Sequence, residues 1–161
     1  HTDSEAKIFI EDLALQRTVV LDENGQPFAA MDSQNCLATN IMTNRLYTLA
    51  SNEQSPETFH ILVRGSLEDS WRQFATIDAK NPITWVGILG LDGTENLTVV
   101  YETETARHYL AYSKDAALIK SLKTLHINPG YDPLYPDWVG SDGTIYSVCI
   151  DKDALRIMQL N

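Results

Sequence analysis

The predicted fold is built around the segment Ile83–Glu104, ITWVGILGLDGTENLTVVYETE. It contains an apolar run, a turn and a second run rich in β-branched residues, and both runs have the length of a β-strand. Asp92-Gly93, followed by Asn96, provides the turn chemistry of a hairpin. Apolar side chains fall on both faces of the first run. We therefore expect this strand in the middle of a sheet that is covered on both sides.

Further strands are predicted where short β-branched and aromatic runs are bounded by turn residues. They cover residues 18–21, 28–31, 58–64, 106–112, 144–151 and 154–160. The first two flank Asp22-Glu23-Asn24-Gly25, which is a strong hairpin signal. Most connections are short, and short connections favour antiparallel pairing.

Two segments show the apolar spacing of amphipathic helices. Ser66 is a potential N-cap, and the apolar residues after it lie at i, i+4, i+7 and i+8: Leu67, Trp71, Phe74 and Ala75. Ser113 precedes residues 114–125, where three leucines share one helical face: Leu118, Leu122 and Leu125. The sequence therefore predicts an α+β fold, with a mainly antiparallel sheet of about six to eight strands and two or three helices packed on one face.

The composition is that of a folded protein. With 161 residues, 43% of them hydrophobic and 21% charged, we expect one globular domain over residues 2–161, and we interpret His1 as a tag remnant. The net charge is −10, from 22 acidic and 12 basic residues. This charge argues against nucleic acid or an anionic membrane as a partner. It suits a basic protein partner, and it also suits solubility alone.

Direct membrane insertion is not expected, because no apolar run approaches the roughly 18 residues that a spanning helix needs. Cys36 and Cys149 leave two alternatives open. They form a disulfide in an oxidising compartment, or each is a buried free thiol. A periplasmic or otherwise extracytoplasmic location is preferred to a cytoplasmic one. The sequence gives no oligomeric state.

Catalytic and metal-binding patterns are weak. Cys36 is a candidate nucleophile with His108 as its base, although the local signatures of known cysteine hydrolases are missing. The internal histidines, His60, His108 and His126, lie 18 or more residues apart. We therefore expect neither a metal site nor a cofactor.

The segment Ile127–Gly143 is the best candidate for a functional site, because long aromatic loops often bind partners. Its candidate binding residues are Tyr131, Asp132, Tyr135, Asp137 and Trp138. The prolines at 133 and 136 stiffen the aromatic residues, and the carboxylates suit a basic partner. The structural alternative is a compact loop whose aromatic side chains cover one end of the sheet.

Three functions compete on this evidence. The first is a non-enzymatic protein-binding module, such as a bacterial inhibitor or immunity-type protein that neutralises a basic partner. The second is an extracytoplasmic small-ligand sensor or adaptor domain, which the paired cysteines would suit. The third is a cysteine hydrolase that uses Cys36 and a histidine. The aromatic, acidic loop favours the first.

Overall fold

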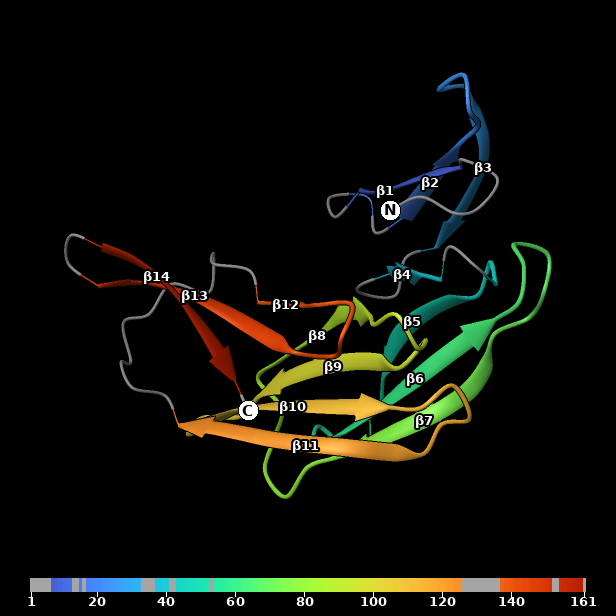
Figure 1. The fold of residues 1–161 in the computed structure, drawn as a ribbon. Coiled ribbons are helices and arrows are strands. Elements are labelled where there is room, and N and C mark those ends of the chain that lie inside the picture. The colour runs from blue at the N-terminus through green and yellow to red at the C-terminus, as the bar shows by residue number, and fades with distance from the viewer. Residues whose placement is uncertain are drawn as a thin grey trace. The chain divides into compact units, whose positions relative to one another are not determined.

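The computed structural model describes residues 7–12, 15, 17–32, 37–40, 43–52, 54–125, 137–151 and 154–160. In these residues every regular element is a β-strand (Figure 1). The predicted α+β fold, with helices packed on a sheet, is therefore wrong. Nothing helical in the same part of the chain is long and apolar enough to cross a membrane.

Four antiparallel sheets are built from fourteen strands in the described residues. The first sheet contains β1 (Ile8–Asp12), β2 (Arg17–Leu21) and β3 (Pro27–Asp32). The second contains β4 (Leu37–Thr39), β5 (Leu46–Ser51), β6 (Thr58–Arg64) and β7 (Arg72–Asp78). The third contains β8 (Trp85–Leu91), β9 (Leu97–Glu102), β10 (Ala106–Tyr112) and β11 (Leu118–Leu125). The fourth contains β12 (Trp138–Val139), β13 (Ile145–Asp151) and β14 (Ala154–Leu160).

Within each sheet, neighbouring strands are also neighbours in sequence (Figure 1). Each sheet is thus a meander, closed by short hairpins.

The chain divides into two compact units, His1–Pro82 and Ile83–Asn161. Each unit contains one three-stranded and one four-stranded sheet. The prediction of a single domain over residues 2–161 stays a prediction.

The core of the first unit lies between its two sheets. Phe9 and Val20 of the three-stranded sheet form one buried cluster with Leu37 and Leu46 of the four-stranded sheet. Burial of an aliphatic or aromatic side chain of this size contributes about 1.5–3 kcal/mol, so this cluster is a main source of the unit's stability.

The second unit has the same construction. Val100 of β9 and Tyr109 of β10 pack against Ile145 of β13. The partly buried Leu89, Leu122 and Leu160 surround this cluster. One face of the sheet β12–β14 is therefore packed against the four-stranded sheet of its unit.

Four hairpins use the same turn. Its first N–H donates to the carbonyl of its fifth residue, and its fourth N–H donates back to the first carbonyl. The turns begin at Asp22, Asp92, Ser113 and Gly140. Their fourth residues all have a positive φ: Gly25 at 75°, Glu95 at 67°, Ala116 at 66° and Gly143 at 77°. Two of the four positions thus hold residues with a side chain in a backbone conformation that favours glycine.

The predicted helix after Ser113 is a hairpin turn followed by strand β11. The Ser113 hydroxyl accepts the N–H groups of Asp115 and Ala117, as an N-cap serine would, but here it closes the turn. Residues 118–125 then pair with β10, so cross-strand hydrogen bonds replace the expected helix.

The predicted helix after Ser66 is also wrong, because residues 72–78 form β7 and pair with β6. Leu67 and Trp71 do bury part of their surface, against the core of the first unit. The guanidinium carbon of Arg64 lies 4.5 Å from the ring centre of Trp71, and Arg64 Nη1 donates to the Leu67 carbonyl at 3.1 Å. These contacts hold the segment in place without a helix.

The predicted hairpin in Ile83–Glu104 is present as β8 and β9, with its turn at Asp92. Its first strand, however, lies at the edge of its sheet rather than in the middle. Strand β12 runs beside β8, and an added Cβ at Gly90 would lie 3.6 Å from the Val139 side chain. A neighbouring sheet, not a helix, therefore lies beside this strand.

Candidate functional site

Two of the five candidate binding residues, Asp137 and Trp138, fall in the described part of the chain. Tyr131, Asp132 and Tyr135 lie outside it, so their predicted role stays a prediction. Asp137 directly precedes β12, and Trp138 is the first residue of that strand. Their side chains have different environments.

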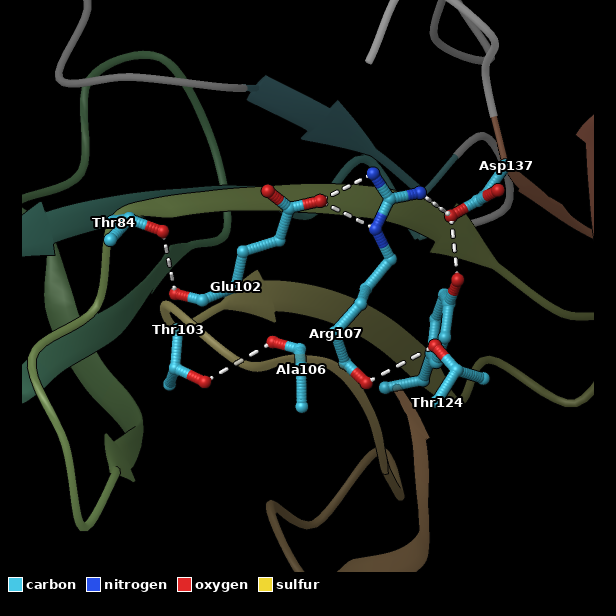
Figure 2. Close-up of polar contacts among 8 residues, drawn as sticks. Thr84, Glu102, Thr103, Ala106, Arg107, Thr124 and Asp137 are labelled. Atoms are coloured by element: carbon cyan, nitrogen blue, oxygen red, sulfur yellow. Dashed lines mark hydrogen bonds and ion pairs between the residues drawn. The ribbon is translucent and has the colours of Figure 1, made fainter. Parts of the chain in front are cut away.

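Asp137 belongs to a polar cluster on the four-stranded sheet of the second unit. Figure 2 shows Arg107 between the carboxylates of Glu102 and Asp137. Arg107 Nε donates to Glu102 Oε1 at 2.6 Å, and its Nη1 donates to Asp137 Oδ2 at 2.8 Å. The hydroxyl of Tyr109 donates to the same Asp137 oxygen at 2.8 Å.

The cluster is buried and carries one more negative than positive charge. The Asp137 side chain is 3% exposed, and its Oδ1 has no hydrogen-bond partner among the described residues. Burial lowers the pKa of Arg107, but the hydrogen bond to Glu102 and the charge of Asp137 outweigh it and raise that pKa above its usual value. Burial and Asp137 also raise the pKa of Tyr109. Asp137 therefore ties the start of β12 to β10 rather than presenting its charge at the surface.

The Trp138 side chain lies away from this buried polar cluster. It stacks on Tyr146, its cross-strand neighbour, with ring centres 5.3 Å apart and planes 17° apart. Side chains alternate along a strand, and Ile145 is packed inward, so Tyr146 and Trp138 lie on the opposite face of the sheet. By the same alternation and the pairing of β13 with β14, the Ile157 side chain also lies on this outer face. We call Trp138, Tyr146 and Ile157 the aromatic face.

The aromatic face is open to solvent. Trp138 is 37% exposed and Ile157 is 61% exposed. Exposed apolar groups gathered on one sheet face are typical of interaction surfaces. Trp138 was among the predicted binding residues, whereas Tyr146 and Ile157 were not, although the alternation in Thr144–Asp151 identifies which residues share a face.

The three-stranded sheet of the first unit has a similar exposed face. Phe9 and Val20 point into the core, so the residues beside them in β1 and β2 point outward. These residues are Ile8, Ile10, Val19 and Leu21, and we call them the aliphatic face. Ile8 is 38% exposed and Ile10 is 47% exposed.

The catalytic candidates are not brought together in the described structure. Cys36 lies outside the described residues, as does His126, and only the backbone of Cys149 is described, within β13. The disulfide and the cysteine hydrolase therefore stay predictions. His108 stacks on Tyr101 at 4.5 Å between ring centres. Burial and the charge of Lys123 lower the pKa of His108.

Among the residues that can be described, no group of three or more His, Cys, Asp or Glu side chains is placed to hold a metal ion. A small cavity in the first unit has a volume of ≈ 100 Å³ and is lined in part by Phe9, Leu46 and Leu67. Pockets for drug-sized ligands enclose about 300–1,000 Å³, so this cavity is too small for one.

Comparison with known proteins yields a fold but no family. No family model matches the chain, and no curated protein does. Among solved structures, a protein of unknown function from Bacteroides caccae is similar, with a TM-score of 0.58 and 9% sequence identity. The similarity covers 95% of this chain and 56% of that one, so this chain spans just over half the length of its structural neighbour.

Proposed function

We propose that this chain is a non-enzymatic protein-binding module that contacts its partner through the aromatic face. The observation that supports the proposal is the stacked pair Trp138–Tyr146, half-exposed on a sheet whose other face is already packed. Aromatic residues held rigidly at a surface give large contact area at little entropic cost.

The packed inner face matters because it fixes the position of the rings. Ile145 and Leu160 hold β13 and β14 against the four-stranded sheet, and Asp137, the residue before Trp138, is anchored by its hydrogen bonds from Arg107 and Tyr109. A preformed apolar surface loses less entropy on binding than a mobile loop. The net charge of −10 favours a partner with basic groups beside its apolar surface.

The test compares Trp138→Ala with Leu125→Ala. Leu125 is 69% exposed on β11 and does not belong to the aromatic face, so it is a matched control. Partners are first identified by photo-crosslinking from position 157 in an extract of the producing organism. Direct binding of each purified candidate is then measured by calorimetry.

We expect Trp138→Ala to weaken binding about 30-fold, as loss of a hot-spot residue worth roughly 2 kcal/mol would. The Leu125→Ala variant should bind like the wild type, and both variants should melt within a few degrees of it. Equal binding by all three proteins would contradict the proposal. A large stability loss in Trp138→Ala would show that this ring is part of the core instead.

A further inference from the structure

We infer that the cavity of the first unit binds a short-chain monocarboxylate, and that the buried guanidinium of Arg64 receives its carboxylate group. This site belongs to the first unit, whereas the aromatic face belongs to the second, and it takes a small molecule rather than a protein. Three observations support it: a buried cation without a paired anion, an unpartnered N–H donor, and a cavity beside both.

Arg64 is a buried cation inside the first unit. It pairs with Leu46 in the register of β6 and β5, and directly paired residues lie on the same face of a sheet. Leu46 belongs to the buried cluster between the two sheets, so the Arg64 side chain also lies on that inner face. Arg64 is only 6% exposed. Burial of a charge is costly unless an opposite charge compensates it.

No carboxylate forms an ion pair with Arg64 in the part of the chain that the structure describes. The ion pairs there involve Arg17 and Arg107. Burial lowers the pKa of Arg64, and the charge of Asp69 opposes this effect without cancelling it. An anion bound beside the guanidinium would therefore stabilise the charged form of Arg64.

The guanidinium also has a donor without an acceptor. Its Nη1 donates to the Leu67 carbonyl at 3.1 Å, its Nη2 contacts the sulfur of Met31, which is a weak acceptor, and the Trp71 ring lies over its plane. The buried Nε has no hydrogen-bond partner among the described residues. Nε and Nη2 share one edge of the guanidinium, and two N–H groups on one edge match the two oxygens of a carboxylate.

The cavity provides room for such a ligand next to Arg64. Gly65, Ser66 and Leu67, which follow Arg64 directly, line the cavity, and so does its cross-strand partner Leu46. A water molecule needs about 10–15 Å³ of such space. The volume of ≈ 100 Å³ therefore has room for several waters, or for a molecule of a few non-hydrogen atoms.

The lining of the cavity indicates the chemical class of the ligand. Lys7 contributes a second cation, and Asn44 and Ser66 contribute neutral polar groups. Phe9 and Leu46 supply apolar surface, which suits a short alkyl chain and does not suit the wholly polar surface of phosphate or sulfate. A carboxylate that carries a short alkyl chain satisfies both parts of the lining.

The experiment titrates the purified full chain with propionate, up to about 50 mM at constant ionic strength, a range that detects millimolar affinity. Binding is followed through the NMR resonance of the Arg64 Nε–H group, which would gain a charged hydrogen bond, and through the melting temperature. Propionamide is the matched uncharged control. Sulfate tests whether any small anion is bound.

We expect propionate to bind with a Kd on the order of 1 mM and to shift the Arg64 Nε–H resonance, while propionamide and sulfate leave this resonance unchanged. No response to propionate overturns the inference. An equal response to sulfate also overturns it, because a general anion site would make no use of the apolar lining.

Two substitutions change the charge around the cavity and leave Arg64 in place. Lys7→Gln should weaken propionate binding about tenfold, whereas Lys80→Gln, at an exposed position of the same unit, should have no effect. Asp69 lies close to the cavity, since a Cβ added at Gly65 would be 2.9 Å from its Oδ2. Asp69→Asn should therefore strengthen binding about threefold, because it removes a charge that repels the ligand.

Thermal melting establishes that these variants are folded. Unchanged propionate binding in Lys7→Gln would place the ligand outside the cavity and overturn the inference. Weaker binding in Asp69→Asn would also overturn it, because the carboxylate of Asp69 would then support the site instead of opposing the ligand.

Discussion

Arg107 is the residue on which the polar cluster of the second unit depends. Its side chain is 13% exposed, and it is the cation that the structure places between Glu102 and Asp137. Buried ion pairs contribute little net stability when compared with a well-packed apolar core, but removal of one partner leaves the other charge uncompensated. Removal of Arg107 should therefore lower the free energy of unfolding by more than the net stability that its ion pairs contribute.

We predict that Arg107→Met lowers the free energy of unfolding by about 3–5 kcal/mol, because two buried carboxylates lose their cation. Urea denaturation measures this change. The triple variant that adds Glu102→Gln and Asp137→Asn should recover part of the loss, since it buries no uncompensated charge. A loss in Arg107→Met no larger than that of an exposed control, Arg17→Met, would show that the cluster is solvated.

Ala116 occupies the turn position that glycine fills at Gly25 and Gly143. A φ of 66° costs an alanine roughly 1–2 kcal/mol, and a glycine at this position would avoid that cost. Part of the resulting gain in stability would be lost, because glycine has greater conformational freedom in the unfolded chain. We predict that Ala116→Gly raises the free energy of unfolding by up to about 1 kcal/mol. Ala117→Gly, one residue further on, should bring no gain. Equal effects of the two substitutions would contradict this account of the turn.

At the scale of single elements, strands were predicted well where local pattern and tertiary pairing agree. Strands β6, β10 and β14 span the predicted residues 58–64, 106–112 and 154–160. The two predicted helices were wrong because the spacing of apolar residues within one segment carries no information about a hydrogen-bonding partner elsewhere. Residues 118–125 have apolar residues at helical intervals. They pair instead with β10, the strand just before them in sequence, whose edge supplies backbone hydrogen-bond partners along its length. Serine adds to the ambiguity, since the same hydroxyl contacts begin a helix or close a turn.

Strand β10 gives the second unit a pH dependence through His108. In the fold, burial and the Lys123 ammonium lower the pKa of His108 below its ordinary value of 6.5. The unfolded chain therefore binds more protons near this pH, and the contribution to stability is complete above about pH 6.5 and is lost as the pH falls toward the lower folded value. Tyr101, stacked on the ring, and Lys123, its cross-strand neighbour, are the titratable groups that face it.

We predict that stability falls between pH 7 and pH 5 by more in the wild type than in His108→Gln, as followed by urea denaturation. Lys123→Gln should reduce the fall, because it removes a cation that opposes protonation. Lys120→Gln is the matched control, since Lys120 pairs with Ala111 and lies on the other face of the sheet. Identical pH profiles for the wild type and His108→Gln would contradict the prediction.

At the scale of the whole molecule, the sequence indicated many of the strands but not how they divide into sheets. The choice between one sheet and four depends on which strands lack partners, and no local pattern in Ile83–Glu104 shows that β8 ends its sheet. The candidate site was found only in part for a related reason. Trp138 was predicted as a binding residue because of the aromatic and acidic residues next to it in sequence. The other members of the aromatic face, Tyr146 and Ile157, come from the next two strands.

The meander order of the sheets has a mechanical consequence. In the described part of the chain, the hydrogen-bonded neighbours of each strand within its sheet are strands next to it in the chain. The chain enters and leaves a four-stranded meander at the same end of the sheet, on opposite edges. Tension on these two points opens the hairpins from one side, so the ladder bonds break a few at a time rather than all together in shear. The four-stranded sheets should therefore yield strand by strand at low force, while the hydrogen bond from Gly93 to the Ser141 carbonyl and the Asp137 contacts resist separation of the two sheets in the second unit.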